Sequence, residues 1–417
     1  MSKNLSYSEN YLKHLNAVSP FEEIWNNEVL NNYPDSLPHY PEDWLATLDS
    51  LSEDDLYKID ASIDFKSIQG TSFGDLCDHL RQLVQLPSQE SSKHSLPIHA
   101  FHKINDKKEY EIGILAPFIS NIHQTKGFSQ VIDIGSGVGN ISRVLATHYN
   151  IKTVCLEKDD YFHGLAKKYV EEFSTPQGIK NIEFKQVELE QWHEESLNLI
   201  TPESFVLGLH ACGNLSQRVL ETAKLRHPKF ILNFGCCYLL MNSHEDLNVS
   251  TFAKEHPHRI KHHGLNLAAR YRTHFDLAEF QLKYRVKAFR YALHLFLCEE
   301  AGLKNFISVG DSKNKDYQYD FATYALKKLK KLNLPIQYNA ETLNNFFGDS
   351  KRQKLLRKMF LCNVIRAQFG RAVEHLILLD RAMYLEEHGY DVTLSTFFDE
   401  SLSPRNRGLF AQRQYSP

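Results

Sequence analysis

The chain has 417 residues, of which 42% are hydrophobic and 24% charged, with a net charge of -3, and these values exclude a wholly disordered protein. Its length predicts two modules, or one core with large additions. No run of about 18 apolar residues occurs, and the start MSKNLSYSEN lacks the regions of a secretory signal, so we expect a cytoplasmic protein, or a nuclear one in a eukaryote.

Residues 1–125 are predicted to be mostly helical. Apolar residues recur at helical spacing in two runs, Tyr40–Ile59 and Phe73–Leu86. The polar segment Pro87–Pro97 is typical of a loop. We therefore expect an N-terminal helical region that precedes a different kind of domain.

An alternation of strands and helices begins at Gly127. Five short apolar runs predict strands, with helical sequence available between them: VIDIG after Gly127, KTVCLE at 152–157, Ile182–Val187, Phe205–Leu209 and Phe230–Phe234. Such alternation predicts a parallel, doubly wound sheet, so the fold class is α/β and Rossmann-like. Residues 126–242 would form the first part of this core.

Residues 243–370 interrupt the alternation and predict a basic helical insertion, which includes KKLKK at 327–331 and KRQKLLRK at 351–358. Residues 371–417 then offer a helix at Ala372–His388 and two extended runs, Tyr390–Phe398 and Arg407–Arg413. We expect this helix and strand pair to complete a seven-stranded sheet, which makes the domain discontinuous.

Charge is unevenly distributed along the chain. Residues 251–417 contain 27 Lys or Arg and 17 Asp or Glu, whereas residues 1–250 contain 21 and 34. A basic segment of this kind can attract a polyanion such as nucleic acid, but solvated helix faces give the same pattern. Both interpretations stay open.

The motif VIDIGSGVGN joins the first predicted strand to the next helix. Its residues Gly135, Gly137 and Gly139 lack a Cβ, so the chain can turn sharply and its backbone can approach a ligand. The dinucleotide fingerprint needs a third glycine at Asn140, which weakens the prediction of a nicotinamide oxidoreductase. G-x-G-x-G behind an acidic residue is instead typical of S-adenosylmethionine-dependent methyltransferases.

Two acidic residues suit this cofactor. Asp133 is expected to meet its cationic ammonium end, directly or through water. Glu157 ends the next strand, 22 residues beyond Gly135, where a carboxylate accepts hydrogen bonds from both ribose hydroxyls. The predicted cofactor-binding residues are therefore Asp133, Gly135, Ser136, Gly137, Gly139 and Glu157.

Residues that follow the fourth and fifth strands are expected near the reacting methyl group, because ligands lie beyond the carboxyl ends of such strands. These segments read LHACGN at 209–214 and FGCCY at 234–238. The predicted catalytic residues are His210, which would take a proton from an attacking hydroxyl or amine, and Tyr238, which would orient it. The alternative for His210 is a histidine that is hydrogen-bonded within the core.

Seven cysteines are scattered along the chain, which favours reduced thiols over a disulfide framework. Cys212, Cys236 and Cys237 lie close to the predicted site. Their H-x-C and C-C spacings lack the C-x₂-C pairs of common structural zinc sites, so we predict no metal and a packed apolar role.

Several segments, in this order, resemble the methyltransferase-like family that includes the human ribosomal RNA adenine dimethylase domain-containing protein. They are YPEDW at 40–44, KKEYEI at 107–112, FSQVIDIGSGVGNISRVLA at 128–146, GLHACGNLS at 208–216, NFGCCYLLMN at 233–242, LILLDRAMYLEEHGY at 376–390 and SPRN at 403–406. The resemblance implies a class I methyltransferase fold that binds S-adenosylmethionine at Asp133, Gly135, Gly137 and Glu157. It does not supply a substrate.

Two features bear on the acceptor. Asn214 stands where members of this family have Asp; Asn serves equally well as a helix cap but cannot act as a base. Methylation of adenine N6 generally uses Asn or Asp followed by Pro-Pro and an aromatic after the fourth strand, and residues 210–212 here read His-Ala-Cys, which disfavours that reaction.

These observations predict an S-adenosylmethionine-dependent methyltransferase that acts on a macromolecule, RNA or protein, with the basic insertion helping to hold it. The alternative is a non-catalytic S-adenosylmethionine-binding module that interacts with RNA. The sequence defines neither the methylated atom nor the oligomeric state.

Overall fold

The computed structural model describes residues 5–31, 33–89, 96–188, 192–241, 247–270, 275–300, 302–303, 306–310, 312–332 and 338–414. The chain forms two compact units. We call residues 1–17, 84–270 and 373–417 the sheet unit, and residues 18–83 and 271–372 the helical unit. Within the described ranges, no helix is long and apolar enough to cross a membrane.

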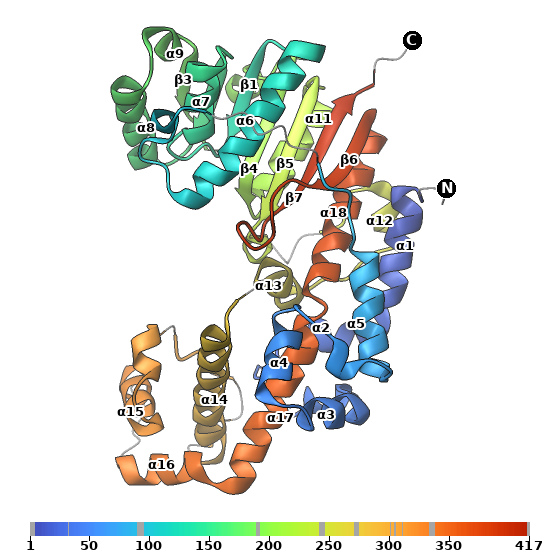
Figure 1. Ribbon diagram of the computed structural model, residues 1–417, viewed down its shortest axis with the longest axis vertical. Coiled ribbons are helices and arrows are strands. Elements are labelled where there is room, and N and C mark those ends of the chain that lie inside the picture. Colours follow the sequence, from blue (N-terminus) through green and yellow to red (C-terminus); the bar gives the residue numbers. More distant parts are fainter. Residues whose placement is uncertain are drawn as a thin grey trace. The chain divides into compact units, whose positions relative to one another are not determined.

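Seven strands form the sheet of the sheet unit, in the order β3-β2-β1-β4-β5-β7-β6 (Figure 1). The first five are parallel, and β7 runs antiparallel to both β5 and β6. The strands are β1 Gln130–Ile134, β2 Thr153–Glu157, β3 Ile182–Gln186, β4 Ser204–Cys212, β5 Phe230–Cys236, β6 Tyr390–Thr396 and β7 Arg407–Arg413. The predicted α/β class is thereby confirmed, and β6 and β7 form an antiparallel pair at one edge of the sheet.

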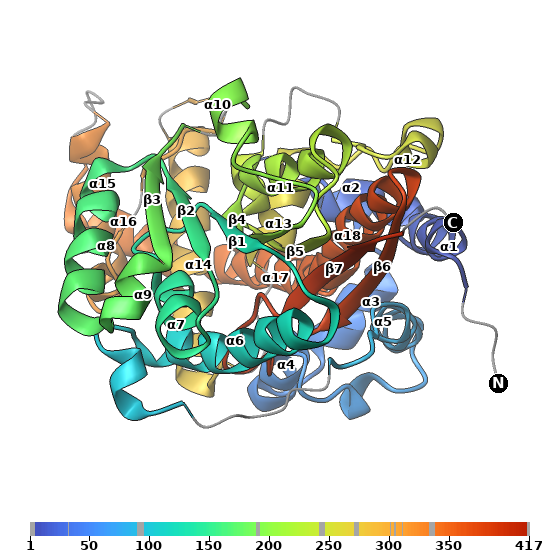
Figure 2. The ribbon, with the colours of Figure 1, turned by 90° about the horizontal axis from the view of Figure 1, so that it is seen from above.

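Helices cover both faces of this sheet, which explains why its central strands are apolar throughout. Figure 2 shows α6 and α7 on one face and α11 and α18 on the other. The helices of the unit are α1 Tyr7–Val18, α6 Asp106–Lys126, α7 Asn140–His148, α8 Asp160–Phe173, α9 Pro176–Lys180, α10 Glu194–Leu197, α11 Leu215–Leu225, α12 Thr251–Glu255, α13 His262–Arg270 and α18 Gly370–Glu387. Buried Ile112, Leu115 and Ile119 of α6 belong to the same core as Phe205 and Phe230.

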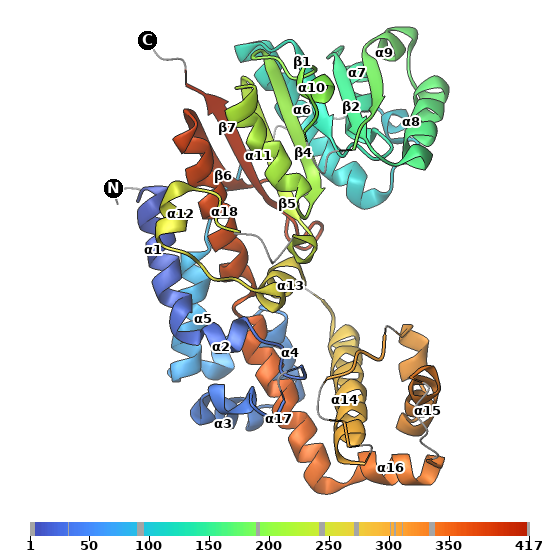
Figure 3. The ribbon, with the colours of Figure 1, turned by 180° about the vertical axis from the view of Figure 1, so that it is seen from behind.

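The helical unit combines helices from both ends of its sequence. It contains α2 Glu22–Trp25, α3 Glu42–Asp49, α4 Glu53–Asp60, α5 Ser72–Leu83, α14 Leu277–Glu299, α15 Phe321–Lys331, α16 Ala340–Gly348 and α17 Ser350–Ala367. α14 packs against α17 and α15, and α17 also contacts α3 and α4 (Figure 3). Part of the N-terminal region therefore shares a core with the insertion, so the compact units do not follow the predicted ranges 1–125, 126–242, 243–370 and 371–417.

The same packing pairs the charges of the two segments. Five cations of α14 and α17 contact acidic residues between positions 28 and 60: Lys283 with Asp60 at 2.5 Å, Lys287 with Glu28 at 3.0 Å, Arg357 with Asp49 at 2.5 Å, Lys358 with Glu42 at 3.0 Å and Arg366 with Glu28 at 3.1 Å. Part of the charge asymmetry along the sequence is thus neutralised within this unit. The asymmetry by itself no longer indicates a surface for a polyanion.

A buried arginine of α18 supports the ends of the central strands. Arg381 is 1% exposed, and its Nη1 donates to Ser216 Oγ at 2.9 Å. Its guanidinium carbon lies 5.4 Å from the ring centroid of Tyr238. Gly235 admits this guanidinium only because it lacks a Cβ, which would overlap Nη1.

We expect Arg381→Met to lower the free energy of unfolding by about 3 kcal/mol, since it removes one member of a buried polar network. Urea unfolding of the full chain, followed by circular dichroism, measures this change. Lys358→Met is the control, because Lys358 and Glu42 form a pair at the surface, and it should have a much smaller effect. Equal midpoint shifts in the two variants would contradict this role for Arg381.

Candidate functional site

The turn after β1 has the backbone that its glycines predict. Gly135, Gly137 and Gly139 have φ values of +69°, +56° and +67°, in the left-handed region that favours glycine. A Cβ on Gly135 would lie 2.6 Å from Leu215 Cδ2, whereas a Cβ on Gly137 would meet no atom within 4 Å. The backbone at Gly137 is therefore open on the side where a ligand can approach.

Glu157 lies against this turn. Its Oε2 accepts a hydrogen bond from the Gly137 amide at 2.8 Å, and its Oε1 accepts from the amides of Lys158 and Asp159 at 2.9 and 3.0 Å. The side chain is thereby fixed beside the open face of the turn. A carboxylate has about four acceptor positions and three are used here, so one remains for a ribose hydroxyl.

Asp133 is buried at the end of β1 and is 2% exposed. Its Oδ2 accepts a hydrogen bond from Ser142 Oγ of α7 at 2.8 Å. Burial raises the pKa of Asp133 to about 6, although this hydrogen bond lowers it. The carboxylate is therefore mostly ionised at neutral pH and would favour a nearby cation.

This titration predicts that affinity for S-adenosylhomocysteine, which carries the same ammonium group, falls as the pH is lowered from 7 to 5. At pH 5 about nine tenths of Asp133 is protonated, so the dissociation constant rises up to about tenfold if the carboxylate contacts that group. Calorimetric titration at pH 7 and at pH 5 measures this change in the dissociation constant. Asp133→Asn should bind more weakly at pH 7 and lose this pH dependence. If the dissociation constant changed between pH 7 and pH 5 by the same factor in both proteins, the prediction would be contradicted.

Folding stability has the opposite dependence. The folded pKa of Asp133 exceeds the usual value of 3.8, so its ionisation lowers stability as the pH rises from about 4 to about 6. Weaker binding at pH 5 therefore cannot be attributed to a loss of stability caused by Asp133.

A bulge in β4 places His210. The strand continues past the predicted end at Leu209 to Cys212, and its pairing with β5 shifts register between Gly208 and Ala211. His210 has a φ of +57°, which is uncommon for a residue with a side chain. Bulges and strained residues of this kind often re-aim a side chain next to a functional site.

The partner of His210 is Glu111 of α6. His210 Nε2 lies 2.9 Å from both carboxylate oxygens of Glu111, which is fully buried. Ser403 Oγ donates to Glu111 Oε1 at 2.7 Å, and the ammonium groups of Lys107 and Lys108 lie 3.5 and 3.2 Å from the same carboxylate. Glu111 is not among the site residues predicted from the sequence, although it lies in KKEYEI, because its buried position beside His210 arises only in the folded chain.

Electrostatics favour a neutral histidine beside an ionised carboxylate. Burial alone would raise the pKa of Glu111, but the hydrogen bond from His210, with help from Lys108 and Ser403, lowers it to about 2. Burial lowers the pKa of His210, and Lys108 adds to that effect against the Glu111 bond. A neutral His210 that donates from Nε2 to Glu111 keeps Nδ1 as a proton acceptor.

The glycine turn and this pair belong to the same region. β1 and β4 are neighbours, with Asp133 paired to Leu207, three residues before His210. Lys108 acts electrostatically on both Asp133 and His210. The arrangement can bind a cationic ligand at the turn and accept a proton at the next strand.

Tyr238 lies elsewhere, in the 3-10 turn Tyr238–Leu240 after β5. It is 1% exposed, and its hydroxyl donates to the Gly235 carbonyl at 3.2 Å and to Glu374 Oε1 at 3.4 Å. Burial raises the pKa of Tyr238 far above its usual value. These bonds give no support to the predicted contact between Tyr238 and an acceptor.

Asn214 precedes α11 in helical conformation, with φ -64° and ψ -22°, and its side chain makes no capping hydrogen bond. A cap role therefore does not account for this position.

Gly213, the residue before Asn214, is constrained by packing, because a Cβ there would lie 2.8 to 2.9 Å from Leu240, including its backbone. The loop after β4 thus packs tightly against the segment after β5.

The three cysteines at these strand ends converge. The Sγ atoms of Cys212, Cys236 and Cys237 all lie within 4.8 Å of one another, and those of Cys212 and Cys236 are 3.3 Å apart. Cys236 is buried, but Cys212 is exposed. The predicted packed apolar role therefore suits Cys236 but not Cys212.

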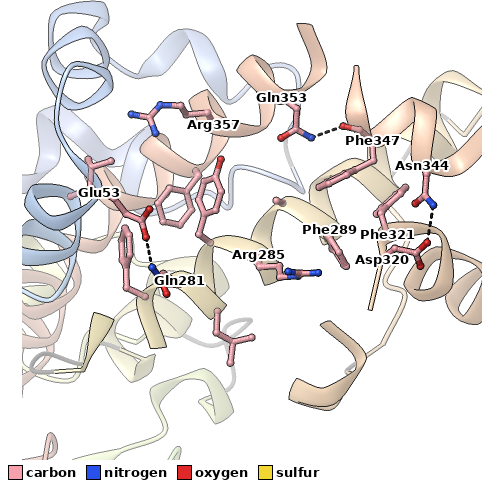
Figure 4. A pocket seen from close by; sticks show the side chains of 16 residues that line it. Glu53, Gln281, Arg285, Phe289, Asp320, Phe321, Asn344, Phe347, Gln353 and Arg357 are labelled. Carbon is pink, nitrogen blue, oxygen red and sulfur yellow. Dashed lines mark hydrogen bonds between the residues drawn. The ribbon is translucent and has the colours of Figure 1, made fainter. Parts of the chain in front are cut away.

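The helical unit contains a separate cavity of about 890 Å³. Figure 4 shows Phe289, Phe321 and Phe347 lining it together with Arg285 and Arg357. Arg285 Nη2 donates to the Tyr319 carbonyl and Arg357 Nε donates to Asp49, so both cations already have partners. None of its lining residues belongs to the glycine turn or to the His210–Glu111 pair.

Comparison with solved structures finds partial similarities. Two structures of the methyltransferase domain of bacterial CtHen1 share 13% and 14% sequence identity with this chain, each covering 30% of it, with a TM-score of 0.24. The chain spans 65% of the length of either structure. An O-methyltransferase from Bacillus cereus, solved in complex with SAH, shares 17% identity over 52% of this chain and 84% of its own, also with a TM-score of 0.24.

Comparison with protein families gives one match, at residues 107–244, to a model described as a methyltransferase domain. The match covers a third of the chain. It contains β1 to β5, the glycine turn, Glu157, and both His210 and Glu111. The part of the chain that carries the candidate site is therefore similar to a methyltransferase domain.

Proposed function

We propose that the protein is an S-adenosylmethionine-dependent methyltransferase that acts on a macromolecule, RNA or protein. The observation that carries this proposal is the turn at Gly137, whose open backbone lies beside the fixed carboxylate of Glu157. A ribose placed against the turn would meet that carboxylate, and an ammonium group would meet the negative charge of Asp133. The family match of residues 107–244 supports the same function.

The residues around the turn fit this cofactor. Gly137 leaves the turn open where a Cβ would lie, and Asn140 Oδ1 is buried without a hydrogen-bond partner among the described residues. Asp133, Gly135, Ser136, Gly137, Gly139 and Glu157 would hold it. When bound, S-adenosylmethionine supplies an electrophilic methyl group on a sulfonium with a good leaving group.

The residues of this chain would act mainly on the acceptor. Alignment of the acceptor atom with the methyl group provides much of the rate enhancement in such a displacement. Nδ1 of His210 would accept the proton of an attacking hydroxyl or amine, while Glu111 holds the ring and stabilises the imidazolium that forms. Ser403 and Lys108 keep Glu111 ionised and in place.

The carboxyl end of β4, where the acceptor would bind, is partly exposed, which suits a large substrate. The His210 side chain is 17% exposed, and Cys212, two residues further along the strand, is exposed. Absence of the Asn-Pro-Pro-aromatic element after β4 argues against adenine N6 as the acceptor. Because five cations of α14 and α17 are paired with acidic residues, the basic composition of these helices does not by itself favour RNA over protein.

Two measurements test this function. Calorimetric titration with S-adenosylhomocysteine should give one binding event per chain, and no binding would overturn the assignment of the cofactor. Transfer of a labelled methyl group from S-adenosylmethionine into cell extract should give a labelled macromolecule. Nuclease and protease treatment of the product then distinguishes RNA from protein; binding without any transfer would leave only a non-catalytic module.

A further inference from the structure

The three converging thiols form a cluster that the proposed methyl transfer does not use. Cys212 ends β4, and Cys236 ends β5 directly opposite it in the parallel register. Cys237 follows at once. All three Sγ atoms lie within 4.8 Å of one another.

The backbone explains how adjacent cysteines reach one point. Consecutive residues of a strand normally point to opposite faces of a sheet. Cys237 leaves β5 with a φ of +49°, in the left-handed region, and so turns its side chain back toward that of Cys236. Such a conformation is unfavourable for a residue with a Cβ, and residues held in it cluster at functional sites.

The sulfur positions suit a small thiophilic metal ion. Zinc–sulfur bonds of about 2.3 Å at tetrahedral angles place the sulfurs about 3.8 Å apart. The cluster has one separation of 3.3 Å and none above 4.8 Å, so shifts of less than about 1 Å would achieve that geometry. A packed apolar role would not require the three sulfurs to converge at a partly exposed position.

We propose that Cys212, Cys236 and Cys237 bind one Zn²⁺ ion through three sulfur ligands. Each thiol that binds loses its proton to solvent, so binding forms three Zn–S bonds and releases up to three protons. Among the described residues, no His, Asp or Glu joins the cluster as a fourth ligand. The fourth position is thus open on the side of the exposed Cys212, as in zinc sites that bind water or a substrate atom.

The sequence spacing concealed this site because each strand contributes its ligands separately. C-x₂-C pairs indicate zinc when one local turn supplies two ligands, whereas here two parallel strands 24 residues apart supply them. The inference does not depend on the cofactor, since zinc binding is measured without S-adenosylmethionine.

Metal titration of the full-length protein tests the proposal. Protein purified with reductant and stripped with a chelator should take up one Zn²⁺ per chain with about nanomolar or tighter affinity, measured by competition with a chromophoric chelator. Co²⁺ in its place should give the near-ultraviolet charge-transfer absorption of thiolate ligands. Cys212→Ser and Cys237→Ser should each weaken Zn²⁺ binding at least about 100-fold and reduce that absorption.

Cys298→Ser is the matched control, because Cys298 lies in α14, outside the cluster, and it should bind Zn²⁺ as the unaltered protein does. Circular dichroism identifies variants that fail to fold; Cys212→Ser is expected to fold because that side chain is exposed. Three results would overturn the proposal: affinity weaker than micromolar, a cobalt spectrum without thiolate absorption, or a disulfide between Cys212 and Cys236 in the reduced preparation.

Discussion

Gly137→Leu should abolish binding of S-adenosylhomocysteine while the protein stays folded. A Cβ added at Gly137 meets no protein atom within 4 Å, so a leucine side chain there would extend into the space proposed for the cofactor. The dissociation constant should rise at least about 100-fold, equivalent to about 2.7 kcal/mol of binding free energy. Calorimetric titration measures this change.

Gly70→Leu provides the matched control for this variant. Gly70 has a φ of +75° and also has no atom within 4 Å of an added Cβ, but it lies in the helical unit. Both substitutions introduce the same left-handed strain, about 1 to 2 kcal/mol, so both should lower stability by similar amounts. If Gly137→Leu binds as tightly as Gly70→Leu, the cofactor does not lie against the turn.

His210→Asn should reduce labelled methyl transfer by about 10² to 10⁴-fold, the usual contribution of a positioned general base. Asparagine tolerates the left-handed backbone that this position requires, so the bulge in β4 should persist. Initial rates of transfer at saturating S-adenosylmethionine measure the effect. The affinity for S-adenosylhomocysteine should stay unchanged, because His210 is assigned to the acceptor.

Glu111→Gln should lower the same rate, because the neutral amide no longer stabilises the imidazolium that forms when His210 accepts a proton. Glu109→Gln is the matched control: it makes the same chemical change on the same helix, at an exposed position, and should leave the rate unchanged. A rate that is insensitive to both His210→Asn and Glu111→Gln would show that transfer proceeds without a base from this pair. Unchanged thermal unfolding of Glu111→Gln would exclude a loss of folded protein as the cause of a lower rate.

Local patterns of apolar and turn residues predicted the parallel strands of the fold well. Each of the five parallel strands is an apolar run bounded by turn residues, and VIDIG, KTVCLE and the other runs coincide with β1 to β5 within a few residues. β4 and β5 end later than predicted, at Cys212 and Cys236. The bulge at His210 and the turn at Cys237 both occur within apolar sequence, so hydrophobicity does not reveal them. Hydrophobicity marks the start of such strands better than it marks a change of φ.

Charge is the property for which the linear sequence was least informative. Residues 251–417 are basic, yet Lys283, Lys287 and Arg366 contact acidic residues that lie more than 200 positions earlier in the chain. Coulomb interactions depend on distance in space, so a sum over a segment cannot distinguish a free basic surface from a paired one.

The local elements of the candidate site could be read from the sequence: the glycine turn with Asp133 before it, Glu157 at the end of the next strand, and His210 and the cysteines after the fourth and fifth strands. These follow from short-range constraints, because a turn with positive φ needs glycine and a buried strand needs apolar residues. Which distant side chains meet depends on the packing of the folded chain. Packing of α6 on the sheet brings Glu111 to His210, 99 residues away, and the parallel register of β4 and β5 brings three thiols together. Such contacts depend on the arrangement of whole elements, which no spacing within one segment encodes.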